Sequence, residues 1–212
     1  MHTRIKLGTA GLAATLLMGL AVASASANRL SVSNQQFRIV WGQLLMFDEG
    51  MGASAHIRCP VTLEGSFHSR TFAKVSGALI GNVTRAIPGA AETCAEGSAT
   101  MLTETLPWPV TYASFSGTLP RITRVRVLIR GVAFDNTQNE VPCLFKEDGR
   151  SAAAGEFVVE NLGLANRFEF DHTIRLPKFS GSIISCPPET GLEGTGEVTL
   201  LGTTTRIRIS LI

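Results

Sequence analysis

The chain has 212 residues, of which 17% are charged, with 19 basic and 17 acidic side chains. Removing the two basic residues of the first 27 positions leaves 17 charges of each sign. This balance excludes a basic field strong enough to attract nucleic acid or an anionic membrane surface by charge alone. Of the 17 remaining basic residues 14 are arginine, a usage that suggests a high-GC bacterial genome.

The N-terminal segment has the three parts of a secretory signal. Arg4 and Lys6 precede an apolar run from Leu7 to about Ala23, and the small residues Ala25–Ala27 follow it. An uncleaved anchor helix is the alternative, because the run is long enough to span a thin bilayer. We expect residues 1–27 to be removed as a signal peptide. The mature chain, Asn28–Ile212, is then a single domain that is secreted or associated with the cell envelope.

After residue 28 the sequence alternates between apolar and polar residues with period two, and helical periodicity is nearly absent. Clusters of glycine, proline, asparagine and serine separate the alternating segments. We predict strands over Phe37–Phe47, His56–His68, Ala78–Ala86, Ala99–Ala113, Ile122–Phe134, Pro142–Lys146, Glu156–Asn161, Arg167–Leu176, Ser182–Cys186, Glu197–Leu201 and Thr205–Leu211. The predicted fold is all-β, as an antiparallel β-sandwich. One tyrosine and two tryptophans argue against the aromatic girdles of an outer-membrane barrel.

The four cysteines all lie in the mature part, and an even number in an exported chain predicts two disulfides. Their separations exclude a CxxC zinc module or a redox pair, but leave three connectivities open. A faint duplication favours one bridge in each half: "CPVTLEGSF" and "CLFKEDG" open two similar halves, and "ITRVRVLIRG" and "TRIRISLI" close them. We therefore expect the pairs Cys59–Cys94 and Cys143–Cys186, each worth up to about 4 kcal/mol in the chain-entropy model.

The stretch "TETLPWPVTYA" places Trp108 between two prolines. Pro107 and Pro109 remove two amide donors from one side of a strand, which predicts an edge strand or a bulge. The alternation places Trp108 on the same face as Leu106 and Tyr112, so we interpret it as a core residue. The alternative is an exposed aromatic platform that stacks on sugar rings or polymer, and Trp108 is therefore also a candidate ligand-binding residue.

The segment "RITRVRVLIRG" carries an outward row of three arginines, Arg124, Arg126 and Arg130. Two interpretations are open. The arginines pair with glutamates on neighbouring strands, as on an ordinary solvated sheet face, or they bind a sulfated or uronic polysaccharide. We keep the three arginines as candidate ligand-binding residues.

The histidines and carboxylates are the residues that could carry catalysis or bind a metal ion. His56, His68 and His172 are the histidines of the mature chain, and there is no GxSxG nucleophile motif. Glycosidase chemistry needs two carboxylates in one cleft. Candidates such as Glu64, Glu104, Asp135 and Glu140 exist, but any chain with 17 acidic residues offers such pairs. "DNTQNE" lacks the spacing of a calcium loop. We predict no catalytic residue, no metal site and no cofactor.

Three segments resemble exported actinobacterial all-β proteins of unknown function: "CPVTLEGSFHSRTFAKVSGALIGNVTRA", "LTETLPWPVTYASFSGTLPRITRVRVLIRGVAF" and "TLLGTTTRIRISLI". More loosely, "LPW" with spaced cysteines is similar to secreted activators of alkane oxidation. Neither resemblance implies a catalytic residue.

The function expected from these patterns is a non-catalytic binding or structural protein of the cell envelope or extracellular matrix. Its expected partner is a cell-wall polymer, an extracellular surface or another protein. We expect no nucleic acid partner and no integral membrane span after signal cleavage. The alternative is a secreted hydrolase acting on a polysaccharide or an ester.

Overall fold

The computed structural model describes residues 29–48, 55–90, 93–118, 121–138, 140–160, 163–170, 174–182 and 184–212. The predicted signal peptide and His172 lie outside these described residues. Within them the chain is all-β, as predicted, and its only other named element is the short 3-10 helix η2 (Thr103–Thr105).

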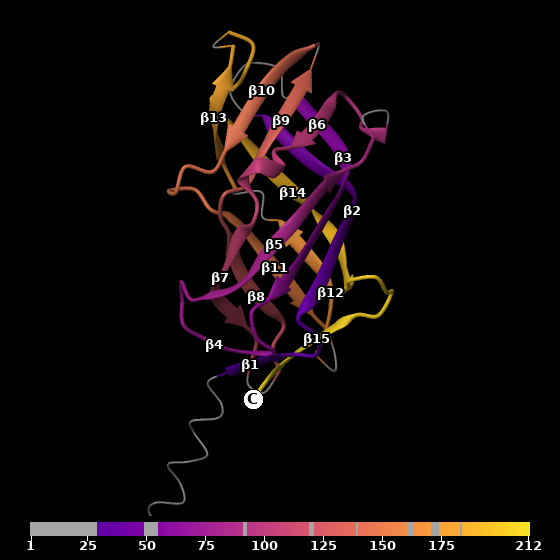
Figure 1. The fold of residues 1–212 in the computed structure, drawn as a ribbon, viewed down its shortest axis with the longest axis vertical. Coiled ribbons are helices and arrows are strands. Elements are labelled where there is room, and N and C mark those ends of the chain that lie inside the picture. The colour runs from indigo at the N-terminus through magenta and orange to yellow at the C-terminus, as the bar shows by residue number, and fades with distance from the viewer. Residues whose placement is uncertain are drawn as a thin grey trace, which may run out of the picture.

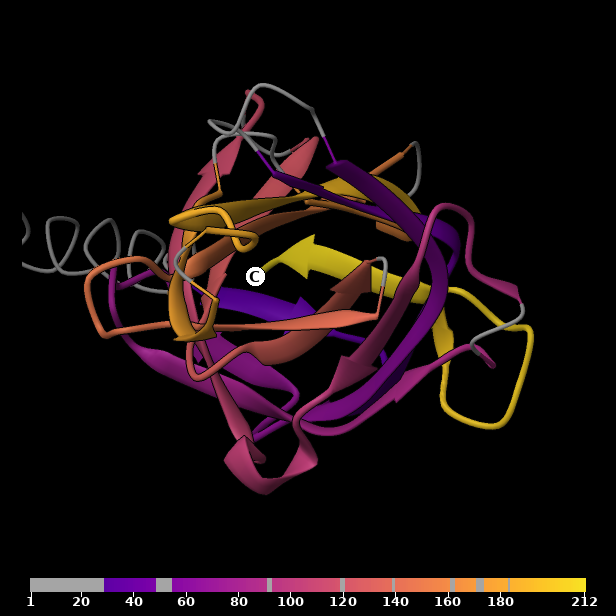
Figure 2. The ribbon, with the colours of Figure 1, turned by 90° about the horizontal axis from the view of Figure 1, so that it is seen from above.

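Eight antiparallel strands close into a barrel (Figures 1 and 2). In ring order they are β2 (Gln36–Asp48), β3 (Ala55–Phe67), β5 (Leu79–Pro88), β7 (Trp108–Ser116), β8 (Arg124–Ile129), β11 (Ala153–Val159), β12 (Leu164–Phe170) and β14 (Glu189–Leu200). The ring closes because β14 pairs with β12 on one side and with β2 on the other. The expected sandwich is therefore replaced by a barrel, whose strands show the same alternation of inward and outward residues.

The remaining strands lie at the two ends of the barrel. At one end β6 (Ser98–Met101), β9 (Ala133–Gln138), β10 (Val141–Lys146) and β13 (Leu176–Gly181) form the cap sheet, which joins the barrel through β13 and β14. At the other end β1 (Arg29–Val32), β4 (Thr71–Ala73) and β15 (Ile207–Leu211) pair together. Seen from above, β1 and β15 cross the barrel (Figure 2), and their inward residues are buried.

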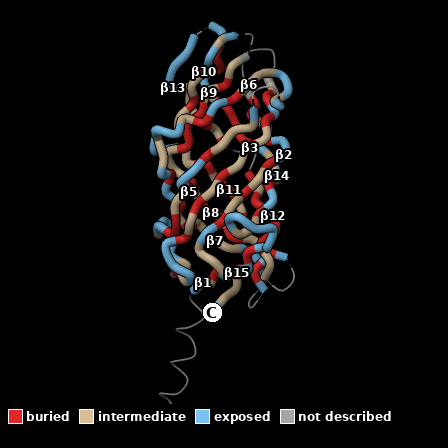
Figure 3. Tube along the Cα trace, turned by 45° about the vertical axis from the view of Figure 1, so that its right-hand side comes forward, coloured by how far each residue is buried: buried red, intermediate tan, exposed pale blue. Residues whose placement is uncertain are grey.

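Aromatic rings fill the barrel by packing over glycines on adjacent strands. A Cβ added at Gly155 would overlap the ring of Phe168, and one at Gly65 would lie 2.5 Å from Cζ of Phe37. The rings also contact one another, with centroids 4.9 Å apart between Phe157 and Phe168. Buried residues accordingly recur along every barrel strand (Figure 3). The interior is a packed core of side chains.

Two predicted strands are each divided in the structure. The segment Ala99–Ala113 is broken by η2 into β6 and β7, so its two parts belong to the cap sheet and the barrel. The segment Ile122–Phe134 is broken at Gly131, which has a φ of +77° that glycine adopts without strain. A single alternating pattern therefore covered two strands that pair with different neighbours.

Three further strand predictions need correction. Ser182–Cys186 forms a loop, because β13 ends at Gly181 with a φ of +126°. Strand β14 begins at Glu189 instead of Glu197. The strand after Pro107 is not an edge, because β7 pairs with both β5 and β8, and Pro109 stands opposite Asn82.

Both predicted disulfides, Cys59–Cys94 and Cys143–Cys186, are confirmed. The duplication that suggested them is not seen in the topology. Five barrel strands come from the half before residue 132 and three from the half after it. The two halves therefore do not form two similar units.

Replacing Gly155 with alanine should lower the free energy of unfolding by about 1–3 kcal/mol, because the added methyl group must displace the Phe168 ring. Denaturant unfolding measures the change. Gly42→Ala on β2 is the control, since a Cβ there meets no atom within 4 Å. Equal unfolding midpoints for the two variants would contradict this account of the core.

Tyr112, the single tyrosine of the chain, lies buried on β7, and its burial raises the pKa of the phenol above the usual value of about 10. Absorbance at alkaline pH should therefore show a tyrosine midpoint above that of the unfolded chain. By linkage, the contribution to stability is complete below the unfolded pKa and is lost as pH rises through the folded pKa. A midpoint equal to that of the unfolded chain would show that the phenol is hydrated.

Candidate functional site

Trp108 is a core residue in the structure. Its side chain is 1% exposed, and its Nε1 donates a hydrogen bond to Oγ1 of Thr105 at 2.7 Å. This confirms the core interpretation. The alternative of an exposed aromatic platform is wrong, because the ring is covered.

The arginine row lies on the outer wall of the barrel and is paired with glutamates. Nη1 of Arg124 donates to Oε2 of Glu156 at 2.8 Å and to Oε2 of Glu169 at 2.7 Å. The hydrogen bond to Glu169, followed by the one to Glu156, raises the pKa of Arg124. Arg126 lies 3.9 Å from Glu156. The contacts of Arg124 and Arg126 agree with the first interpretation of the row, in which the arginines of a solvated sheet face pair with glutamates on neighbouring strands.

Arg130 belongs to a different contact near the end of β8. Its Nη1 lies 3.3 Å from Oε1 of Glu147, whose carboxylate also accepts backbone hydrogen bonds from Gly131 and Gly149. The three predicted arginines thus serve local ion pairs, and polysaccharide binding by the row stays a prediction.

Glu156 and Glu169 stand directly opposite each other on β11 and β12, and Arg124 bridges them. Arg124→Gln should therefore lower stability by about 1 kcal/mol at neutral pH, because two like charges then face each other unscreened. The loss should shrink in about 1 M salt, which screens interactions between exposed charges. Arg126→Gln is the control, because the ion pair of Arg126 with Glu156 is longer, at 3.9 Å, and unfolding at low and high salt is the measurement. A loss that persists unchanged at high salt would assign Arg124 a packing role instead.

The predicted catalytic candidates are dispersed over the fold. His56 lies at the start of β3 and His68 just after its end, where Nε2 is 2.9 Å from Nδ2 of Asn82. Glu64 pairs with Arg38 and Arg85. The other three carboxylates are placed separately: Glu104 lies in η2, Asp135 on β9 and Glu140 before β10. Within the described ranges, no group of three or more histidine, cysteine or acidic residues could hold a metal ion.

Exposed apolar side chains mark a different surface. Among the described large hydrophobic residues, Ile184 and Phe179 are the most exposed, at 78% and 67%. Phe179 lies on β13, two residues before its end, and Ile184 lies in the loop after it. We call this surface the β13 tip and define it by Lys146, Lys178, Phe179, Ser182 and Ile184.

A β-bulge directs Phe179 outward. Along β10 and β13, Leu144 pairs with Ser180 and Phe145 pairs with Lys178, so Phe179 has no partner across the strands. A bulge of this kind turns the extra residue out of the regular alternation. Phe145 is fully buried beneath the sheet, whereas Nζ of Lys146 lies 5.3 Å from the centroid of the Phe179 ring. The bulge thus places an aromatic ring on the solvent side of the cap sheet.

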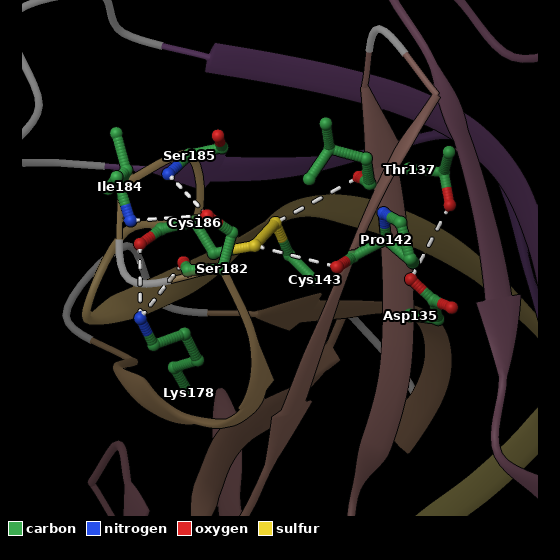
Figure 4. Close-up of a disulfide and its surroundings, with 10 residues drawn as sticks. Asp135, Thr137, Pro142, Cys143, Lys178, Ser182, Ile184, Ser185 and Cys186 are labelled. Carbon is green, nitrogen blue, oxygen red and sulfur yellow. Dashed lines mark hydrogen bonds between the residues drawn. A yellow bond between two sulfur atoms is a disulfide. The ribbon is translucent and has the colours of Figure 1, made fainter.

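Hydrogen bonds within the loop fix the position of Ile184. Oγ of Ser182 accepts hydrogen bonds from the backbone N–H groups of Ile184 and Ser185, each at 3.2 Å, and the Cys186 N–H donates to the Ser182 carbonyl at 3.0 Å. Nζ of Lys178 donates to the carbonyl oxygens of Ser182 and Cys186, both at 3.3 Å (Figure 4). The side chain of Ile184 extends away from the disulfide in this view.

The disulfide attaches the loop to the cap sheet. Cys186 is bonded to Cys143 on β10, and its Sγ lies 3.5 Å from the carbonyl oxygen of Pro142. Both bridged cysteines are buried. The disulfide and the hydrogen bonds of Ser182 thus hold the backbone at Ile184, which reduces the entropy lost on binding. Such a surface can bind a partner.

Sequence reasoning missed Phe179 and Ile184, because it assigned Ser182–Cys186 to a strand with ordinary alternation. Gly181 and the serines on either side of the apolar residues in "FSGSIISC" are turn signals, and they indicate a loop. Reading that signal first would have placed Ile184 in a connection between strands.

Comparison of the chain with protein-family models, with curated proteins and with solved structures finds no match. The resemblance to exported actinobacterial proteins and to activators of alkane oxidation therefore stays a prediction. In the part of the chain that the structure describes, no helix has the length and apolar character needed to cross a membrane.

Proposed function

We propose that this chain is a non-catalytic binding protein that acts outside the cell and contacts its partner through the β13 tip. The observation that carries the proposal is the exposure of Phe179 and Ile184 on a backbone fixed by a bulge, a disulfide and loop hydrogen bonds. The predicted signal and the two disulfides support an extracellular place of action.

The exposed pair is not explained by the fold itself. The cap sheet has its own buried residues beneath the tip, including Phe134 and Phe145 with ring centroids 5.9 Å apart. Neither Phe179 nor Ile184 adds to that core, since most of each side chain is in solvent. Large apolar side chains held in solvent on a strand and on the loop that follows it are a feature of interaction surfaces.

A secreted hydrolase is the second hypothesis, and it needs a base held against a nucleophile. The two described histidines lie at opposite ends of β3, about 40 Å apart for a strand of this length. No contact among the described residues favours the hydrolase.

Replacing both apolar residues of the tip, as Phe179→Ser with Ile184→Ser, should reduce retention on the material that the protein binds by about tenfold or more, because two apolar contacts are lost. Retention is measured on cell-wall preparations, insoluble polysaccharides and hydrocarbon droplets. Near-UV circular dichroism verifies that each variant is folded.

The matched control is Val75→Ser with Leu79→Ser, which alters two other exposed apolar residues, Val75 in the connection between β4 and β5 and Leu79 at the start of β5, 60% and 52% exposed. This control should be retained like the wild type. Equal retention of the tip variant and the wild type, or a wild type that binds none of the materials, would overturn the proposal.

A further inference from the structure

We infer that the outward face of β1, β4 and β15 binds an acidic polysaccharide. Exposed arginines contact the carboxylate or sulfate groups of the polymer, and a row of serine and threonine hydroxyls contacts its sugars. We call the three paired strands the basal sheet, because they lie at the opposite end of the barrel from β13 (Figure 1). The inference goes beyond the proposed function, since it concerns a second surface.

The basal sheet has a buried side and an outward side. Leu30, Phe72 and Ile207 are buried and belong to the core. Side chains alternate across a strand, so the residues between the buried ones face away from the barrel. These outward residues are Arg29, Ser31, Thr71, Ala73, Arg208 and Ser210. The outward side therefore carries arginines and short side chains, with no acidic or aromatic residue among them.

Three hydroxyl groups form a row across the outward side. Ser31 on β1 stands opposite Ser210 on β15 and opposite Thr71 on β4. All three residues are partly exposed. Each hydroxyl can donate one hydrogen bond and accept others. A row of such groups can bind the hydroxyls of a sugar chain.

Arginines lie at one end of this row. The backbone N–H of Arg208 donates to Oγ of Ser33 at 2.9 Å, and the Ser33 N–H donates to the Arg208 carbonyl at 2.9 Å. On the other side of β1, the Val32 N–H donates to the carbonyl oxygen of Arg70 at 2.8 Å. Arg70 and Arg208 thus flank the end of β1, and both are exposed. Arg206, two residues before Arg208, is exposed as well.

The guanidinium groups of these arginines are not occupied by ion pairs. Among the described residues, no carboxylate pairs with Arg70, Arg206 or Arg208. Glu160, which lies in the connection leading to β12, pairs instead with Arg167 at 4.0 Å. A guanidinium in this state can bind an external carboxylate or sulfate through two parallel N–H groups.

The distribution of charge along the molecule supports this assignment. The basal sheet and its connections contain five basic side chains and no acidic one, over residues 29–35, 68–78 and 201–212. The cap sheet and its connections contain seven acidic and four basic side chains, over residues 93–107, 132–152 and 174–189. The balanced total of the mature chain therefore conceals a basic end and an acidic end. Charges act over about 10 Å at 0.1 M salt, so an anionic polymer is attracted at the basal sheet.

The chemistry of the face favours a polysaccharide over other anionic partners. Single-stranded nucleic acid is bound through aromatic side chains on which bases stack, and the outward residues include none. A phospholipid surface requires apolar side chains that enter the acyl layer, whereas Ser31, Ser210 and Thr71 form the centre of this face. The exposed Val75 and Leu201 lie in connections beside the sheet. Hydroxyl and guanidinium groups together match a polymer that carries both hydroxyls and acidic groups.

The test is affinity chromatography of the mature chain on immobilised polygalacturonate, dextran sulfate and neutral dextran. The wild type should be retained on at least one of the acidic polymers and not on neutral dextran, and about 1 M salt should release it. Arg206→Gln with Arg208→Gln should weaken binding by about tenfold, which is about threefold for each arginine. Ser31→Ala with Ser210→Ala should weaken it by about threefold without changing its salt dependence, since no charge is removed.

The matched control is Arg58→Gln with Arg85→Gln, which removes the same charge from exposed arginines of β3 and β5 that are paired with Glu96 and Glu64. This control should bind like the wild type, and near-UV circular dichroism verifies that each variant is folded.

Failure of the wild type to bind either acidic polymer at low salt overturns the inference. Retention that the Arg206 and Arg208 variant leaves unchanged also overturns it, and so does an equal loss in the control, which would indicate net charge alone. Retention on phosphatidylglycerol vesicles without retention on either polymer would assign the face to a lipid surface instead. Phe179→Ser with Ile184→Ser should keep the binding to acidic polymer, so this result is independent of the proposed function.

Discussion

The pairing of β14 with β2 and β12 is the constraint on which the rest of the structure depends. It turns a row of antiparallel strands into a closed ring, so the barrel has no free edge along its wall. Glycines make the closure compatible with large rings, because a Cβ at Gly191 would overlap Phe47 and one at Gly196 would lie 2.7 Å from the Trp41 ring. The Trp41 indole also donates a hydrogen bond to the carbonyl oxygen of Gly194 on the closing strand.

Aromatic side chains fill the interior of the closed barrel. The exposed surface that distinguishes this molecule therefore lies at the ends of the barrel. On the outer wall of β8, β11 and β12, charges are paired across strands, as for Arg124 with Glu156 and Glu169. The cap sheet is different. There a bulge at Phe179 and a loop tied by Cys143–Cys186 expose apolar side chains instead of burying them. The rigid barrel serves as the support for that end.

Both disulfides stabilise segments that the barrel itself holds only in part. Cys94 lies in the segment before β6, where it is bonded to Cys59 and where Ala95 and Arg58 exchange two backbone hydrogen bonds. Cys186 lies in the loop after β13, bonded to Cys143. Each bridge removes conformational freedom from the unfolded chain, by an amount that depends on the length of the closed loop. Bridges of this kind persist in an oxidising compartment.

The sequence by itself determined the all-β class, the inward set of residues such as Val125 and Val127, and the number of disulfides, because these follow from local alternation and from counting cysteines. It favoured the burial of Trp108 without excluding an exposed ring, and it left three cysteine pairings open. Tertiary structure alone decided that the sheet closes as a barrel, since inward and outward residues alternate identically in a sandwich. It also decided that Phe179 is exposed, because a bulge depends on the register between β10 and β13. Register is a relation between distant segments, and a local period of two carries no information about it.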